Sequence, residues 1–189
     1  MPQIRAPILQ VVICWIVFSQ PAGAGLIQTG ESKVTFHATG PGGIKIEGET
    51  AQLELKDKAE EWEIVVALDT LTTGISLRDR HMKEKYLETP KYPKAELVVR
   101  KSDLRLPSAG GFSEGKAPAI LKLHGRQKEV LIDYRVRRAG SGYAVNGTIH
   151  LDMRDYDVAT PSYLGVSVKP NVEVAASFEV KEWSFEVKE

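Results

Sequence analysis

Apolar and polar residues alternate with a period of two over most of the chain, which is the pattern of strands that bury one face. The first clear run begins at Lys33 and places Val34, Phe36 and Ala38 on the same face. Glycine, proline or charged turns separate this run from the ones that follow. The pattern predicts about eight strands, within residues 33–39, 44–55, 62–68, 95–99, 117–123, 130–136, 143–153 and 172–180.

The second run changes its parity part of the way along. It alternates through Ile44 and Ile46 as far as Gly48 and resumes with the opposite parity through Leu53 and Leu55. One extra residue in a strand moves every later side chain to the other face. The sequence therefore predicts a β-bulge close to the glycine.

The period of two is lost in residues 154–170, where we expect an irregular loop with two prolines, and in residues 72–93, where we expect one short helix. Ser76 followed by Asp79 three positions later is typical of a helix N-terminus. The helix is expected from Leu77 to Leu87, because Thr89-Pro90 then stops it. Strands and helices do not alternate along the chain, so the sequence gives no sign of a parallel sheet. The expected fold class is all-β, an antiparallel eight-stranded barrel with one inserted helix, with a β-sandwich of the same strands as the alternative.

The first residues have the features of a secretory signal peptide. Arg5 precedes an apolar run from Ile8 to Phe18, and small residues follow at Ala22 and Ala24. We expect residues 1–24 to be removed after Ala24, which exports the protein to the periplasm or the medium. An uncleaved membrane anchor is the alternative, but it needs ~20 apolar residues. The only cysteine, Cys14, lies in this run, so the mature chain has neither a disulfide nor a thiol nucleophile.

The rest of the chain is expected to form one domain, residues 25–182, followed by a C-terminal extension over residues 183–189. The extension repeats the six residues from Ser177 as a second copy that starts at Ser184. The whole chain has 25 basic and 25 acidic side chains, and the basic ones are not clustered. This composition argues against a nucleic-acid partner.

The polar residues that could carry out chemistry do not form a convincing catalytic or metal site. His37, His124 and His150 fall on the polar parity of their strands, so we expect them to face solvent, and no close-spaced pair of metal ligands occurs. Asp79 and His81 are two residues apart in the expected helix, so they face different directions. We therefore expect no enzymatic activity, no metal and no cofactor. We interpret the cluster Arg78-Asp79-Arg80-His81-Met82 as ion pairing that fastens the helix, with contact to a polar ligand head group as the alternative.

Other catalytic candidates are equally weak. Ser141 lies in a hairpin turn between two glycines, and no Gly-x-Ser-x-Gly motif occurs. Asp155 and Asp157 flank Tyr156 in an expected loop, where carboxylates are usually solvated.

The inward strand faces carry large apolar residues interspersed with alanine and glycine, such as Ala119 and Gly147. A packed core would show the same large residues, but the small ones leave room and favour a cavity. We expect an apolar ligand to contact Phe36, Ile64, Leu97, Leu121, Leu123, Val145, Ile149, Leu151 and Phe178.

Three ordered motifs resemble the YceI-like family of bacterial lipid- and polyisoprenoid-binding proteins. The first is Thr73-Gly74 with Arg78-Asp79, His81-Met82, Tyr86-Leu87 and Tyr92-Pro93. The second is the hairpin Leu121-Lys122-Leu123-His124-Gly125 leading into Val130. The third is the segment 160–166, Thr-Pro-Ser-Tyr-Leu-Gly-Val, continuing to Val172 and Val174.

The resemblance implies a lipocalin-like barrel that acts as a periplasmic carrier or storage protein for a long isoprenoid or another amphiphile. It implies no catalytic residue and no stable membrane insertion, and it leaves the formation of a homodimer open. A non-catalytic structural or stress-related interaction module with a filled barrel core is the alternative function. The motif residues expected at the cavity mouth are Arg78, Asp79, His81, Met82, Tyr86 and Tyr163.

Overall fold

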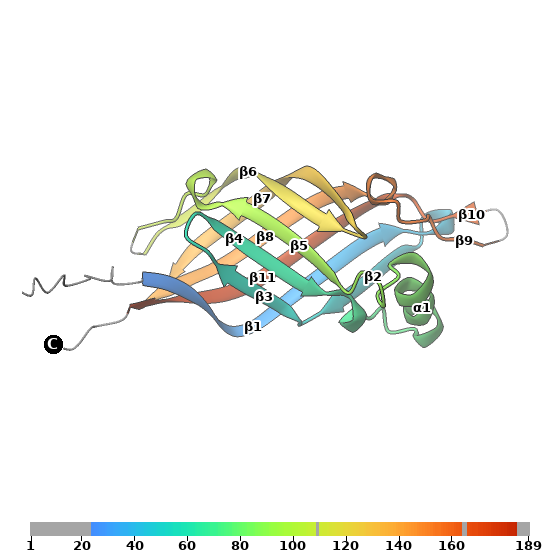
Figure 1. Cartoon of the computed structure of the whole chain (residues 1–189), viewed down its shortest axis with the longest axis horizontal. Coiled ribbons are helices and arrows are strands. Elements are labelled where there is room, and N and C mark those ends of the chain that lie inside the picture. The colour runs from blue at the N-terminus through green and yellow to red at the C-terminus, as the bar shows by residue number, and fades with distance from the viewer. Residues whose placement is uncertain (1–23, 109, 164–165, 185–189) are drawn as a thin grey trace, which may run out of the picture.

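The computed structural model describes residues 24–108, 110–163 and 166–184 of the chain, and the expected signal peptide therefore lies almost entirely outside the described residues. Nine strands form one antiparallel sheet in the order β2-β1-β11-β8-β7-β6-β5-β4-β3. The sheet curls into a nearly closed barrel (Figure 1). Its strands are β1 (Ala24–Thr39), β2 (Lys45–Thr50), β3 (Leu53–Asp57), β4 (Glu61–Ala67), β5 (Lys94–Arg100), β6 (Phe112–Leu123), β7 (Arg126–Ala139), β8 (Gly142–Asp152) and β11 (Asn171–Ser184).

Eight strands were expected, and the barrel sheet of the described residues has nine, because the run 44–55 is divided. β2 and β3 are two halves of one interrupted strand: β2 pairs with β1, and β3 pairs with β4. The interruption falls at Ala51 and Gln52, both exposed, and the buried residues change from even numbers in β2 to odd numbers in β3. The parity change in the sequence therefore marks the place where the chain stops pairing with β1 and begins pairing with β4.

Side chains close the gap between the first part of β1 and β3, which we call the β1/β3 seam. The side-chain amide of Gln28 donates from Nε2 to the Leu53 carbonyl (2.9 Å), and its Oε1 accepts from the Leu55 amide (3.0 Å). Farther along, Ser32 Oγ donates to the Ala51 carbonyl (2.6 Å). The Gln28 amide therefore takes the place of a peptide group where the backbone ladder is missing.

β1 begins at Ala24, nine residues before the strand run found by alternation. A register shift between Thr29 and Lys33, with Gly30 at φ +68°, breaks the period of two in this part of the strand. At the other end of the chain, β11 continues through Trp183 to Ser184, which pairs with Ala24. The expected extension therefore begins inside a strand, and residues 185–189 lie outside the described part.

The expected helix is present as α1 (Ser76–His81), continued by a single π-helical turn, η3 (Met82–Tyr86). Its start differs from the expectation: Ile75 is the N-cap residue, and no side chain caps the helix. Ser76 is the first helical residue, and the Asp79 carboxylate binds the preceding turn, as described below. Within the described residues, no helix combines the length and hydrophobicity needed to span a bilayer.

Three irregular segments gather at one end of the barrel, opposite the end where β1 begins and β11 ends (Figure 1). They are the turn η1 (Pro41–Gly43), the α1–η3 segment, and the hairpin of β9 (Ser162–Tyr163) and β10 (Val166–Ser167). Residues 154–170 were expected to be irregular throughout, but they contain this hairpin and part of the short helix η5 (Met153–Tyr156). The remaining short helices are η2 (Leu68–Thr70) and η4 (Lys101–Asp103).

A backbone bridge ties the α1–η3 segment to the barrel. Thr72, just before α1, exchanges two backbone hydrogen bonds with Glu49 of β2 (2.8 and 2.9 Å). Thr50 and Thr70 add a hydroxyl contact of 2.6 Å beside it. The residues just before α1 are therefore attached to the end of β2, which places the helix beside that strand.

Candidate ligand-binding cavity

The barrel encloses a cavity of about 810 Å³, near the upper end of the range in which proteins bind small molecules. Inward-facing apolar side chains from the barrel strands form most of its wall. Its opening, which we call the mouth, lies between Pro41, the α1–η3 segment, and Pro161, Ser162 and Val168 beside the β9–β10 hairpin. The cavity thus opens at the end of the barrel that carries the three irregular segments.

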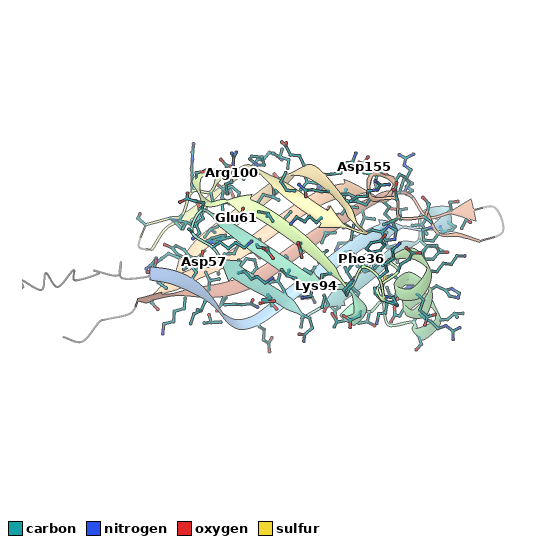
Figure 2. All side chains as sticks on the ribbon, viewed as in Figure 1. Phe36, Asp57, Glu61, Lys94, Arg100 and Asp155 are labelled. Carbon is teal, nitrogen blue, oxygen red and sulfur yellow. The ribbon has the colours of Figure 1, made fainter. Side chains whose placement is uncertain are left out.

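All nine residues that we expected to contact a ligand line this cavity. They come from strands far apart in the sequence, and the alternation of each strand turns them inward. Figure 2 shows Phe36 at the end of the barrel that carries α1, while Asp57 lies nearer to the chain termini. That these residues contact a ligand stays a prediction.

Small residues leave part of the wall open. Gly147 of β8 lines the cavity, and a Cβ built on it would meet no atom within 4 Å. Ala176, its partner on β11, lines the cavity as well. Ala119 is different: it is 3% exposed, belongs to the packed core, and is not part of the cavity wall. Only the first two of these small residues therefore contribute space for a ligand.

A second glycine leaves room for an aromatic residue of the cavity wall. Gly48 of β2 lies opposite Phe36 of β1, and a Cβ on Gly48 would lie 2.3 Å from Cε1 of Phe36. Any larger residue at this position would push the ring away. The glycine therefore allows the Phe36 ring to lie across β2.

Trp62 and Leu104 lie at the inner end of the cavity. Both also line a second, smaller cavity of about 530 Å³, whose wall includes Asp57, Lys101 and Tyr143. Trp62 is 2% exposed. These two side chains therefore separate the apolar cavity from a more polar space near the chain termini.

At the mouth, a hydrogen-bond network connects Asp79, Thr73 and Arg78. The Asp79 carboxylate accepts from the Thr73 amide (2.7 Å), from the Thr73 hydroxyl, and from the Thr72 hydroxyl (2.7 Å). Arg78 donates from Nε to Thr73 Oγ1 (2.8 Å) and from Nη2 to the Thr73 carbonyl (2.9 Å). Asp79 thereby fixes Thr73, and Thr73 in turn positions the guanidinium.

The surroundings of Asp79 favour its ionised form. Burial alone would raise the pKa of this carboxyl, but the hydrogen bonds from Thr73 and Thr72, with the nearby Lys83 charge, outweigh it and leave the pKa below its ordinary value. Asp79 does not line the cavity. It is a structural anion of the 72–74 turn, and its partners are threonines, in place of the ion pairs that we expected for this cluster.

Four of the six expected mouth residues line the cavity: Arg78, His81, Met82 and Tyr86. The side chain of Tyr163 lies outside what the structure describes. The sequence analysis missed Lys85, which also lines the mouth, with its Nζ 5.4 Å from the Tyr86 ring centroid. The spacing of 78, 81 and 85 on one helix face could have identified it.

His124 was expected to face solvent, and this prediction was wrong. Its side chain is 11% exposed. His124 and Gly125 form the β6–β7 turn with φ of +50° and +74°, so the histidine leaves the strand parity on which the prediction depended. The ring lies 4.5 Å from that of Tyr92, with Nδ1 3.0 Å from the Tyr156 carbonyl and Nε2 3.1 Å from Glu88. His124 therefore connects the β6–β7 turn to the segment 88–92 and to the end of η5.

The other candidate residues are on the outside. His37 and His150 are exposed and lie beside Glu47 (3.4 Å) and Glu173 (3.1 Å) on neighbouring strands. Asp155 lies 3.8 Å from Lys128, and Asp157 pairs with Arg126. Within the described ranges, no three histidine, cysteine or acidic side chains lie close enough together to hold a metal ion.

Comparisons with known proteins agree with this geometry. The family model described as "YceI-like domain" matches residues 26–180. A polyisoprenoid-binding domain from Saccharophagus degradans, implicated in plant cell wall breakdown, superposes with a TM-score of 0.69 at 18% identity, over 85% of this chain and 98% of that one. BcnA from Burkholderia cenocepacia superposes with a TM-score of 0.63 at 15% identity, over 78% and 95% of the two chains. A comparison with curated proteins gives no match.

Proposed function

The chain belongs to the YceI-like domain family, and we propose that it is an exported, non-catalytic carrier or storage protein that encloses one long apolar molecule in its barrel. An isoprenoid chain is the ligand class that we favour, because a solved structure with the same fold is a polyisoprenoid-binding domain. The residues proposed to contact the chain are Phe36, Ile64, Leu97, Leu121, Leu123, Val145, Ile149, Leu151 and Phe178.

The observation that carries this proposal is the cavity itself. About 810 Å³ of space lies inside a wall made mainly of apolar side chains. An apolar chain that enters is removed from water, at ~25 cal/mol per Å² of buried apolar surface before the cost of ordering the chain. This volume also supports the carrier over the alternative of an interaction module with a filled core, because such a core would leave only small voids.

The mouth suits the entry of a lipid. Ile75 and Leu77 line the cavity and are 54% and 55% exposed. Ile44, next to η1, is also exposed. Exposed apolar residues grouped at an opening offer a first contact for a chain that leaves a membrane or another carrier.

A titration with the neutral fluorescent probe N-phenyl-1-naphthylamine tests the proposal. The delipidated protein, residues 25–189, should bind the probe with saturation near one per barrel, and farnesol should displace it. A protein that binds no probe after delipidation, while remaining folded by circular dichroism, would contradict the proposal and favour the filled-core alternative.

A further inference from the structure

The charged residues of the cavity wall are of one sign. Among the described residues that line the cavity, the basic side chains are Arg78, His81 and Lys85, all at the mouth, and no aspartate or glutamate occurs anywhere in the wall. In a chain with equal numbers of acidic and basic residues, this asymmetry makes the mouth electropositive.

The three side chains belong to one helical segment and share one of its faces. Arg78 and His81 lie in α1 and Lys85 in η3, at spacings of three and four residues, which places them one above the other. The cavity wall includes them together with the apolar Leu77, Met82 and Tyr86. Charged groups therefore border the apolar interior directly, as the head of an amphiphile borders its tail.

Arg78 is held in position by uncharged acceptors, without a direct salt bridge to any described residue. Its two protein contacts are the hydroxyl and the carbonyl of Thr73, which are both uncharged acceptors. The carboxylate next to it in the sequence, Asp79, is occupied by Thr72 and Thr73. Within the part of the chain that the structure describes, neither Arg78 nor Lys85 forms a salt bridge with an acidic side chain. A guanidinium has five N–H donors, so donors remain for a ligand.

From this arrangement we propose that the enclosed molecule is an anionic amphiphile, with its carboxylate or phosphate head bound by Arg78, His81 and Lys85 at the mouth and its tail in the barrel. The inference rests on the proposed function and goes further, because it excludes a neutral head as the preferred one. Asp79 and Thr73 act as positioning residues for Arg78.

Two matched ligand pairs test the charge of the head: hexadecanoic acid against hexadecan-1-ol, and farnesyl phosphate against farnesol. Each displaces N-phenyl-1-naphthylamine from the delipidated protein below its critical micelle concentration. The anionic member of at least one pair should bind about tenfold more tightly, the effect of one charge-assisted hydrogen bond. The pair with the larger difference shows whether the head is a carboxylate or a phosphate.

Two double variants locate the effect. R78Q/K85Q should abolish the difference between anion and alcohol while leaving the affinity for the neutral probe unchanged. R80Q/K94Q removes the same amount of positive charge at exposed positions outside the cavity wall, and it should retain the difference.

The outcomes separate this inference from the proposed function. If the probe and the alcohols bind but the anions bind no more tightly, the head-group inference is wrong and the carrier proposal stands. A difference that disappears equally in R80Q/K94Q would also overturn it, because the effect would then come from net charge. If neither the probe nor any of the four ligands binds, the carrier proposal itself fails.

Discussion

Gly147 on β8 lies directly opposite Ala176 on β11, and both face the open space of the barrel. A Cβ at position 147 would meet no atom within 4 Å. We therefore expect Gly147→Leu to fill part of the cavity, to weaken probe binding severalfold, and to change the free energy of unfolding by less than about 1 kcal/mol. Fluorescence titration and urea unfolding of the delipidated variant measure the two effects.

Ala119→Leu is the matched comparison, because Ala119 is buried in the packed core, away from the cavity wall. The larger side chain should overpack its neighbours and lower the free energy of unfolding by roughly 1–3 kcal/mol. Equal destabilisation by the two substitutions would mean that the space next to Gly147 is already filled.

The β1/β3 seam depends on one side-chain amide. Gln28→Leu would leave the Leu53 carbonyl and the Leu55 amide without their partner. We expect a loss of about 2 kcal/mol of unfolding free energy and faster amide hydrogen exchange at Leu55. Gln127→Leu, at an exposed position of β7, is the control. If the Leu55 amide stays protected in the Gln28 variant, the barrel is not closed by this side chain.

Tyr156 and Tyr143 are both buried tyrosines, but their hydroxyls differ. The Tyr156 hydroxyl has no hydrogen-bond partner among the described residues, and burial raises its pKa to about 12. Tyr143 donates to Glu182 (3.0 Å). Tyr156→Phe should therefore leave the free energy of unfolding unchanged or raise it, whereas Tyr143→Phe should lower it by about 1 kcal/mol. Thermal melts of the two variants measure these changes. If Tyr156→Phe lowered the melting temperature more than Tyr143→Phe, the hydrogen bonding assigned to the two hydroxyls would be wrong.

The ionisation of Glu63 makes the stability of the barrel depend on pH. Hydrogen bonds from Lys58 and Lys56, in that order of effect, lower the pKa of this buried carboxyl from 4.5 to about 2. A lowered folded-state pKa stabilises the fold above pH 4.5, and this contribution is lost as the pH falls towards 2. Both lysines are substantially exposed, so screening reduces the contribution to about 1 kcal/mol.

Glu63→Gln should accordingly be less stable than the wild type at pH 6, and the difference should disappear as the pH approaches 2. Urea unfolding at half-unit steps of pH measures this difference. A difference that stays constant over that range would show that the carboxylate charge is not what stabilises the strand.

Alternation in the sequence was sufficient to predict the barrel wall. Residues such as Ile64, Leu121 and Ile149 lie on strands whose single buried face fixes their direction, so a period of two identified them as inward-facing. The change of parity was visible in the same way, but it marks the break between β2 and β3 and not the β-bulge that we predicted near Gly48. These features depend on local pattern alone.

The features that the sequence did not predict depend on contacts between distant segments. The first part of β1 was missed because the bulge at Gly30 breaks its period. Gln28 is an ordinary polar residue until β3 lies beside it. The direction of the His124 side chain follows from the positive φ of the turn, which strand parity does not describe. Lys85 was missed because its position at the mouth, beside the expected Arg78, depends on how the helix packs against the end of the barrel.

The most direct test of the central claim is the content of the barrel. The mature protein should be purified from its native host without detergent, extracted with organic solvent, and analysed by mass spectrometry, with native mass spectrometry of the intact protein for stoichiometry. We predict about one apolar chain per barrel, recovered in repeated preparations and strongly reduced in Gly147→Leu. Preparations that are consistently empty, together with a crystal structure in which side chains fill the interior, would contradict the carrier function.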